Sequence, residues 1–555
     1  MNVQDAIKPY GSGTYLVTAA LIYANGKIHI GHVGGPCLPA DVFVRYLRMR
    51  GHRVLFVCGS DEYGVAILLQ AHKEGKTPQA VIDEYHRRNK STFERFGISF
   101  DIYDRTSRPE HAATAQAFFK KLHEKGVFTT QTKAQYYDAE AKIFLADRYL
   151  EGTCPHCQFE GAYGDQCESC GLSLDPGDLL SPRSKLTQTT PIQKSTTHWY
   201  LPLERYQSWL EAWIETKRDV WRANAYGQST SWLKAGLKPR AMTRDLDWGV
   251  PVPLDEAKGK VLYVWFEALL GYISATKRWA KENGVDWRDF WQDDNTELIH
   301  FIGKDNIVFH TIIFPAMLKA YGDYILPTHV VSSEFMQLEG EKISTSRNHA
   351  IWIEDIPTKW IEPYRYFLQS ISPDQKDGNF RQEDFVERHN KELVGVLGNF
   401  IHRAITLLHR YTAAKIPENH AKHPEDNALR QSIAQLNQQI CTELEGFKIK
   451  QALHHVMEIA HLGNQYLATT EPWHLIKTDL PRTRTILYHA AQLVAHLQRA
   501  LTPFLPTTAA RIGKMIQHIA TKWSDDDNFD LLKTGRAVEK PVLLFEKIEK
   551  NTLGD

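Results

Sequence analysis

The chain has 555 residues, of which 43% are apolar, and its 66 basic side chains balance 66 acidic ones. This length predicts several domains of a folded, soluble protein, and the balanced charge excludes a global attraction to nucleic acid while leaving a local basic face open. Because the N-terminus lacks a secretory pattern and no apolar run would span a bilayer, we expect no membrane association.

The first half of the chain begins with a strand–helix–strand pattern. Residues 14–21 form a β-branched apolar run that ends in a turn-like sequence, a helical stretch follows over 29–46, and residues 54–61 form a second buried strand. This order predicts a parallel sheet. Further helices are expected over 76–96 and 108–126.

Residues 130–200 differ in composition from the regions around them. They hold a cysteine cluster and a connection rich in Pro, Ser and Thr, which predicts an inserted subdomain rather than more sheet. Strand-like runs then return at residues 260–266, 297–303 and 329–333. From about residue 384 onward, long stretches repeat apolar residues at helical spacing, which predicts a helical bundle.

The sequence His29-Ile30-Gly31-His32 directly follows the first strand and its turn. The start of a helix presents unpaired backbone N–H groups and a positive dipole end, both of which favour phosphate. Imidazoles three residues apart lie on one side of a helical turn and can hydrogen-bond phosphate oxygens as charge develops. The pattern alone has low specificity, and its place at a strand–helix junction makes it a candidate nucleotide site.

A second candidate segment, residues 342–347 (KISTSR), follows the last predicted strand in a loop flanked by glycine. A lysine and three hydroxyl groups on a mobile loop can close over a triphosphate. Taken by itself, the segment is more typical of a solvated surface loop than of a nucleotide site.

Four of the seven cysteines form two Cys-x-x-Cys pairs, Cys154/Cys157 and Cys167/Cys170. This spacing predicts tetrahedral Zn²⁺, and a closed shell of four thiolates makes the metal structural. His156 is an alternative ligand, whereas a redox role is disfavoured because neither pair lies at a strand–helix junction. The other cysteines are scattered, so no disulfide framework is expected and a reducing cytoplasm fits best.

With these motifs in this order, the chain resembles the methionyl-tRNA synthetase family of class I aminoacyl-tRNA synthetases over nearly its whole length. Further matching segments are Pro39-Ala-Asp41, Cys58-Gly-Ser-Asp61, Arg244-Asp-Leu-Asp-Trp-Gly249, Gly303-Lys-Asp-Asn306 and Glu471-Pro-Trp473. The resemblance implies an α/β fold with a Rossmann-like parallel-sheet catalytic domain, a zinc-knuckle insertion and an α-helical anticodon-binding bundle. The implied domains are residues 1–129 and 236–335 for the two catalytic halves, 130–235 for the insertion, 336–390 for the Lys342 loop and stem-contact region, and 391–555 for the bundle.

The implied activity is ATP-dependent ligation of L-methionine to tRNA(Met) through methionyl-adenylate, with release of AMP and pyrophosphate. The residues implied for methionine are Leu21, Tyr23, Asp61, Trp265, Ala268, Tyr272, Phe309 and His310, with Asp61 holding the ammonium group. Those implied for ATP are Asn25, His29, Gly31, His32, Gly303, Asp305, Lys342, Ser344 and Thr345, with Mg²⁺ offsetting phosphate charge. His29, His32, Lys342 and Arg244 are the implied catalytic residues.

For tRNA, the implied anticodon-binding residues are Asn399, Arg403, Pro472 and Trp473. An indole can stack on an unpaired base while amide and guanidinium groups bond base edges, which is how proteins commonly read single-stranded RNA. Because the sequence ends soon after the bundle, without the family's dimerising C-terminal domain, we expect a monomer.

The sequence departs from the family pattern in its loop and its pocket. The loop's usual second lysine is Thr345, so one charge is missing unless Arg347 compensates, and Ile22, Leu269 and Leu270 stand where the resemblance expects other residues. Two alternatives therefore stay open. One is a second-copy enzyme with a reshaped amino-acid pocket that tolerates an inhibitor or another substrate. The other is a synthetase-like RNA-binding paralogue that does not charge tRNA.

Overall fold

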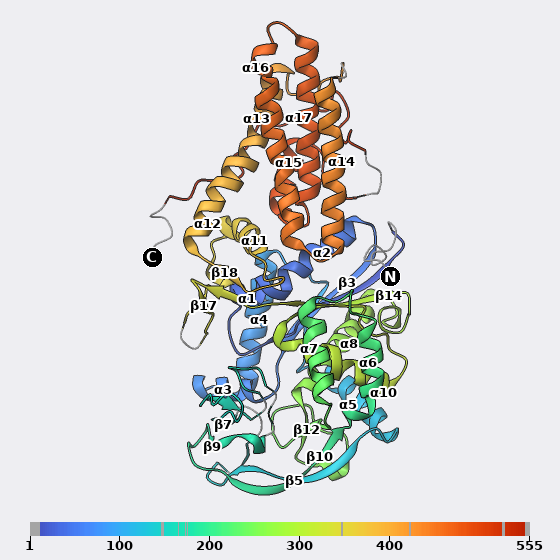
Figure 1. Cartoon of the computed structure of the whole chain (residues 1–555), viewed down its shortest axis with the longest axis vertical. Helices are drawn as coiled ribbons and strands as arrows, with labels where there is room; N and C mark the ends of the chain where they lie inside the picture. The colour runs from blue at the N-terminus through green and yellow to red at the C-terminus, as the bar shows by residue number, and fades with distance from the viewer. Residues whose placement is uncertain are drawn as a thin grey trace.

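The computed structural model describes residues 11–549, apart from residues 142, 146–148, 165, 173, 175, 346–347, 421–422 and 524–527. An α/β body and a helical bundle lie at opposite ends of an elongated molecule (Figure 1). Arg347, a candidate to replace the missing loop charge, lies outside the described residues. Within the described part of the chain, no helix has both the length and the apolar character needed to cross a bilayer.

A parallel six-stranded sheet forms the centre of the α/β body. Its order is β15-β14-β1-β3-β2, with β4 also paired to β3. The strands are β1 Thr14–Ala19, β2 Ile22–Tyr23, β3 Arg53–Asp61, β4 Ile102–Arg105, β14 Thr296–Gly303 and β15 His329–Ser333. Pairing of β1 with β14 places Thr18 opposite His300, which confirms that the sheet resumes after the insertion.

Helices cover both faces of this sheet, as parallel strands require. They are α1 Ile30–His32, α2 Leu38–Met49, α3 Val65–Glu74, α4 Pro78–Phe96, α5 Pro109–Glu124, α8 Val264–Asn283, α9 Arg288–Trp291 and α10 Phe314–Tyr321. The single helix expected over 29–46 is interrupted by a π-helical turn at Val33–Cys37, which contains Pro36. Proline cannot donate a backbone hydrogen bond, so the regular helical pattern is broken there.

The strand expected at residues 260–266 is wrong in its second half. Only Val261–Leu262 (β13) is extended, and α8 begins at Val264. β13 pairs with β12 (Thr243–Arg244), outside the six-stranded sheet. A short apolar run does not distinguish a buried helix from a strand, which explains the error.

The insertion forms its own sheets, separate from the six-stranded one, and holds strands that the sequence analysis did not predict. A long antiparallel ribbon of β5 and β10 closes the lower end of the molecule (Figure 1). The elements are β5 Thr129–Asp138, β6 Ile143–Phe144, β7 Leu150–Thr153, β8 Ala162–Tyr163, β9 Leu180–Ser184, β10 Ile192–Leu201, α6 Gln207–Glu215, α7 Ala223–Ala235 and β11 Arg240–Ala241.

A small sheet and two helices connect the body to the bundle. These elements are β16 Met336–Leu338, β17 Glu341–Lys342, α11 Ile361–Ser370, β18 Gly378–Phe380 and α12 Gln382–Arg388. The predicted bundle is confirmed, and its helices are α13 Asn399–Tyr411, α14 Pro424–Glu445, α15 Ile449–Thr470, α16 Pro472–Leu475, α17 Leu480–Leu501 and α18 Pro506–Met515. The bundle and body share one apolar core, since the rings of Phe43 and Phe447 lie 4.8 Å apart.

Candidate active site

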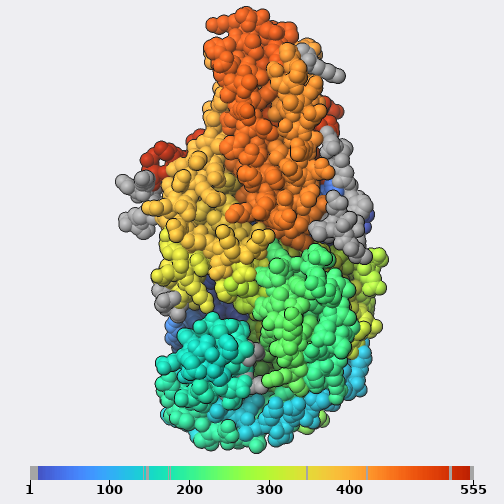
Figure 2. Space-filling view, viewed as in Figure 1, coloured from blue at the N-terminus to red at the C-terminus, as the bar shows by residue number. Residues whose placement is uncertain are grey.

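A cavity of about 750 Å³ opens at the carboxyl ends of the central strands. Asp61 ends β3, Gly303 ends β14 and Ser333 ends β15, and all three line the cavity. In open parallel sheets this edge is where ligands bind. The surface is hollowed where the teal part of the insertion, its green part with α6 and α7, and the yellow connecting segment with β16–β18 meet (Figure 2).

Most of the residues implied for methionine and ATP meet in this one cavity. The lining includes Leu21, Tyr23, Asn25, His29, Gly31, His32, Asp61, Trp265, Ala268, Tyr272, Gly303, Asp305, Phe309, His310, Lys342 and Thr345. Ser344 and Arg244 are not part of the lining. Arg244 stacks on the ring of Tyr263 at 3.8 Å and donates to the carbonyl oxygens of Ala241 and Thr243.

The imidazoles of His29 and His32 stack on each other, with ring centroids 3.7 Å apart. The Gly31 N–H donates to His29 Nδ1 at 3.1 Å, and the His29 N–H donates to His32 Nδ1 at 3.2 Å. These two amides are therefore not available to phosphate, contrary to the expectation from the helix start. Any side chain at Gly31 would also collide with His29, because a Cβ there would lie 2.9 Å from Cε1.

This capping arrangement fixes the protonation of both imidazoles. Burial lowers the pKa of His32 to about 4, and burial together with His32 lowers the pKa of His29 well below its usual value. Both rings are therefore neutral near pH 7. Since each Nδ1 accepts a hydrogen bond, each Nε2 carries the proton. The motif thus offers two neutral N–H donors rather than two cations.

An aromatic cluster forms the apolar end of the cavity. The rings of Trp265 and Phe309 are stacked with centroids 3.9 Å apart, and Tyr23 meets Trp265 edge-on at 6.4 Å. His310 Nδ1 lies 2.9 Å from the Asn306 carbonyl, which can only accept, so Nδ1 is protonated. His310 Nε2 then accepts from the Tyr272 hydroxyl at 3.0 Å. The cluster suits a polarizable, uncharged side chain.

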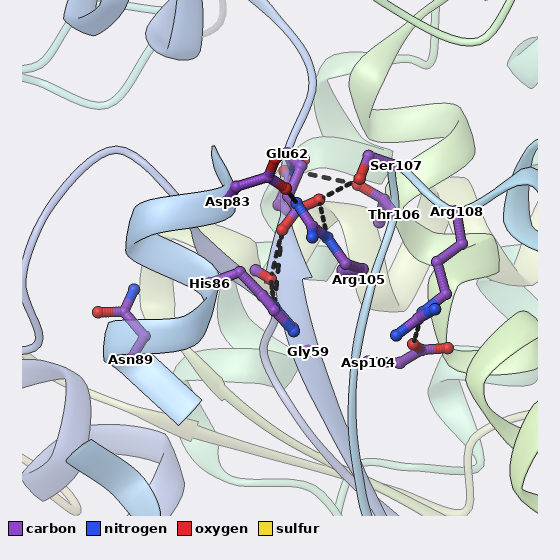
Figure 3. Close-up of polar contacts among 12 residues, drawn as sticks. Gly59, Glu62, Asp83, His86, Asn89, Asp104, Arg105, Thr106, Ser107 and Arg108 are labelled. Atoms are coloured by element: carbon purple, nitrogen blue, oxygen red, sulfur yellow. Dashed lines mark hydrogen bonds and ion pairs between the residues drawn. The ribbon is translucent and has the colours of Figure 1, made fainter. Parts of the chain in front are cut away.

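Asp61 is the buried carboxylate of the cavity, with 3% of its surface exposed. Burial raises its pKa well above the usual value, and repulsion from Glu267 adds to this effect. Its position is held by the next residue, Glu62, whose carboxylate contacts Arg105 at 2.7 Å and Ser60 at 2.9 Å (Figure 3). The Glu62 carbonyl also accepts from the Trp248 indole.

Lys342 lies at the end of β17, so the expected loop starts as a hairpin rather than as irregular chain. The chain beyond the loop returns to the histidine motif, where the Ile30 N–H donates to the Ile351 carbonyl and the Ile353 N–H donates to the Ile28 carbonyl. Trp352 lies between these contacts and donates to the Asn348 side chain. The loop and the histidine motif are thereby joined.

Several lining residues carried no motif in the sequence. Lys27 and Lys73 add cationic side chains to the cavity, and Gln166, which precedes Cys167, brings the cysteine cluster to its rim. A smaller cavity of about 60 Å³ shares Gln166 with it and is also lined by Trp232 and Arg240. Only the folded chain brings these segments together, so nothing local in the sequence identifies them.

The four clustered cysteines have their sulfur atoms within 4.8 Å of one another. Sγ atoms of Cys154 and Cys170 lie 4.0 Å apart, and those of Cys157 and Cys167 lie 3.6 Å apart. A tetrahedral Zn²⁺ with bonds of about 2.3 Å places sulfurs about 3.8 Å apart, so the residues fit this ion. His156 does not belong to the set of side chains that could hold this ion.

The residues implied for the anticodon meet at the far end of the bundle, where α13 approaches α16 (Figure 1). The Arg403 guanidinium lies 5.5 Å from the Trp473 ring centroid, and the Asn399 amide donates to Asn464 at 3.1 Å. Trp473 is half-buried and Asn399 is exposed, whereas Pro472 is buried. Pro472 therefore starts α16 rather than presenting a binding surface.

Comparison with known proteins adds independent evidence. A family model described as "tRNA synthetases class I (M)" matches residues 15–405, and one described as "Anticodon binding domain of methionyl tRNA ligase" matches residues 416–555. The methionine–tRNA ligase of Bacteroides fragilis is 51% identical over 97% of this chain and 79% of its own length. That of Cytophaga hutchinsonii is 49% identical over 97% of this chain and 80% of its own length.

The fold is also found among solved structures. Mycobacterium tuberculosis methionyl-tRNA synthetase bound by methionyl-adenylate aligns with a TM-score of 0.80 at 22% identity, covering 96% of this chain and all of that one. The free form of that enzyme aligns with a TM-score of 0.73. By the family match over residues 15–405 and the identity to curated ligases, the chain belongs to the methionyl family of class I tRNA synthetases.

Proposed function

We propose that this protein ligates L-methionine to tRNA(Met) in two steps. In the first, a methionine carboxylate oxygen attacks the α-phosphorus of ATP, and pyrophosphate leaves. In the second, the 2′-hydroxyl of the terminal adenosine attacks the carbonyl carbon of methionyl-adenylate, its proton passes to solvent, and AMP leaves. The observation that carries the proposal is the single cavity that joins the stacked histidines, Lys342, the aromatic cluster and Asp61.

Each group in the cavity has a role in this proposal. The thioether side chain enters the Trp265–Phe309 cluster, while Asp61 pairs with the ammonium group. The Nε2–H groups of His29 and His32 donate to phosphate oxygens as charge develops in the transition state. Lys342 supplies positive charge from the loop. Positioning and charge stabilisation carry the reaction, without a covalent nucleophile on the protein.

In the proposed complex, ATP is contacted on one side by Asn25, Gly31, Gly303 and Asp305. Ser344 and Thr345 contact it from the loop. Ser344 and Arg244 lie outside the cavity lining, so their contribution requires the loop or the guanidinium to move toward the substrate. Mg²⁺ bound to ATP would neutralise part of the phosphate charge. Zn²⁺ held by the four cysteines would stabilise the insertion.

The finer parts of the proposal concern tRNA and the state of the protein. Trp473 stacks on an anticodon base while Asn399 and Arg403 bond base edges, with Pro472 fixing the start of α16. We also propose a cytoplasmic location and a monomeric state. Sedimentation of the purified chain would test the monomeric state. A tight dimer would contradict it.

Methionine-dependent exchange of pyrophosphate into ATP tests the proposed function. We expect exchange that requires L-methionine and falls at least tenfold in Lys342→Gln. Exchange that is absent from the folded, metal-loaded protein would overturn the proposal and favour an RNA-binding paralogue. Charging of tRNA(Met) by the same preparation then tests the second step.

A reshaped amino-acid pocket is a second candidate, because Ile22 and Leu269 line the cavity. Leu270 is fully buried and does not line it, so it acts only through packing. We expect a Leu269→Pro/Leu270→Ile variant to change methionine affinity or inhibitor sensitivity if this candidate is correct. Identical values for both proteins would end it.

A further inference from the structure

A second buried acid lies behind Asp61. Glu267 is fully buried on α8, between Trp265 and Ala268, which both line the cavity. α8 packs against β3, and Asp61 is the last residue of β3. Two carboxyl groups of like charge therefore share one region from which water is excluded, where they cannot both ionise without a large cost.

The cations of this region are already paired with other acids. Arg105 bonds both Glu62 and Asp83, each at 2.7 Å (Figure 3). Arg108 and Arg278 both bond Asp104, each at 2.7 Å. Among the described residues, no Lys or Arg nitrogen lies within 4.0 Å of a carboxylate oxygen of Asp61 or Glu267.

The partner of Glu267 is a histidine rather than a fixed cation. Glu267 Oε2 lies 2.7 Å from His111 Nε2, and Oε1 has no hydrogen-bond partner in the described structure. His111 Nδ1 lies 2.9 Å from Ser274 Oγ, whose hydroxyl donates to the Gly271 carbonyl at 3.1 Å. The Ser274 oxygen must therefore accept from Nδ1–H, and a proton is required between Nε2 and Oε2. Burial lowers the pKa of His111 to about 4, which assigns that proton to Glu267.

The remaining titratable groups in this region do not relieve the pair. Glu62 follows Asp61 directly beyond β3 and bonds Arg105, and its charge raises the pKa of both Asp61 and Glu267. His86, on α4, lies 3.6 Å from Glu62, and its pKa is lowered to about 3 by burial and by Arg105. It is therefore neutral near pH 7 and adds no positive charge.

We infer that Asp61 and Glu267 form a coupled acid pair that retains a proton in the free protein. The pair releases this proton to solvent when an ammonium group binds at Asp61. Glu267 is a positioning residue in this scheme, because it holds the proton of the pair and acts on the amino acid only through Asp61. The inference rests on the proposed function, in which Asp61 receives the substrate ammonium. No covalent bond changes, and the released proton passes to the buffer.

Calorimetric titration at pH 7 in two buffers with different heats of ionisation measures this release. We expect a measurable fraction of a proton to leave per L-methionine bound. L-methioninol, which has the ammonium group but no carboxylate, is expected to produce the same release. 4-(Methylsulfanyl)butanoate, which lacks the ammonium group, is expected to produce none.

Glu267→Gln tests the role of the second acid. The variant lacks the carboxyl group that holds the proton in the free protein, so proton release is expected to fall at least twofold. The pH below which methionine affinity declines is expected to move downward. Glu282→Gln, at a side chain 54% exposed on the same helix, is the matched control and should behave as wild type.

The outcomes separate the two proposals. Methionine that binds without proton release, or with equal release in Glu267→Gln, overturns the acid pair and leaves the proposed function standing. A folded protein that does not bind methionine at all overturns the proposed function itself. Thermal unfolding of Glu267→Gln shows whether the variant is folded, and if it is not, the comparison of methionine with 4-(methylsulfanyl)butanoate on wild type still decides.

Discussion

Arg365 and Asp41 form an ion pair at 2.8 Å in which both side chains are 0% exposed. Arg365 belongs to α11, while Asp41 belongs to α2 of the α/β body. The same guanidinium donates to the carbonyl oxygens of Phe96, which ends α4 of the body, and of Phe504, which lies between α17 and α18 of the bundle. One buried cation therefore connects the α/β body, the connecting helix and the bundle.

Arg365→Leu is expected to lower the free energy of unfolding by about 3–5 kcal/mol, because it removes one of the two arginines that pair with a buried carboxylate. Burial raises the pKa of Asp41, but Arg45 and Arg365 outweigh it and hold that pKa below its usual range. The carboxylate therefore stabilises the fold above its unfolded pKa, and this contribution is lost as pH falls. Urea unfolding of both proteins at pH 7 measures the difference. A change below 1 kcal/mol would contradict the role given to this pair.

Trp473→Ala is expected to weaken tRNA(Met) binding by about 1–3 kcal/mol, or roughly 5- to 150-fold in Kd, through loss of base stacking. Methionine-dependent pyrophosphate exchange should be unchanged, because Trp473 belongs to α16 at the tip of the bundle, whereas the cavity lies in the α/β body (Figure 1). Filter binding at fixed salt provides the measurement. Trp287→Ala, in the body, is the matched control for loss of an indole.

Cys157→Ser is expected to abolish zinc binding, since tetrahedral coordination needs all four thiolates. Metal analysis of the purified protein should fall from one zinc per chain to almost none. Cys441→Ser, at a cysteine outside the cluster, should retain the metal. Full zinc content in Cys157→Ser would show that another residue, such as His156, completes the site.

The buried histidines predict a loss of stability in acid. Burial lowers the pKa of His310 and His329 to about 4 and, with Arg499, lowers that of His496 to about 3. In the unfolded chain the same groups titrate near 6.5. As pH falls from about 6.5 to about 4, the unfolded state therefore takes up protons that the folded state does not, and the free energy of unfolding decreases.

His496→Gln isolates one of these groups, because an amide can still donate to the Phe529 carbonyl that the imidazole contacts. We expect stability measured by urea unfolding to fall less steeply between pH 6.5 and pH 4 in this variant than in wild type. Equal slopes in the two proteins would mean that His496 does not titrate as its burial requires.

The sequence correctly predicted that the histidine motif follows the first strand, and it predicted the strands β14 and β15. HVVSS at 329–333 coincides with β15, and the run at 297–303 lies within β14. These segments are β-branched, short and bounded by turn residues, so local preference and burial agree. The same reasoning failed at Tyr263, where an apolar run turns into α8.

The hydrogen bonds and protonation states of the site could not be predicted from the sequence. The stacking of His29 on His32 follows from their spacing, but the hydrogen bonds that occupy their Nδ1 atoms depend on the backbone at the turn. Glu267 and His111 are 156 residues apart and meet only when α5 packs on α8. No local pattern marks such a pair, because its chemistry arises from shared burial.

The pairing of β1 with β14 has a consequence for synthesis of the chain. β1 is complete at Ala19, but its neighbour begins only at Thr296. At 5–20 residues per second, a ribosome takes roughly 15–55 s to make the intervening chain. One edge of β1 therefore stays unpaired while the whole insertion is translated. An exposed strand edge is a site where chains aggregate. The emerging protein needs protection during this interval, and the N-terminal segment alone is expected to aggregate.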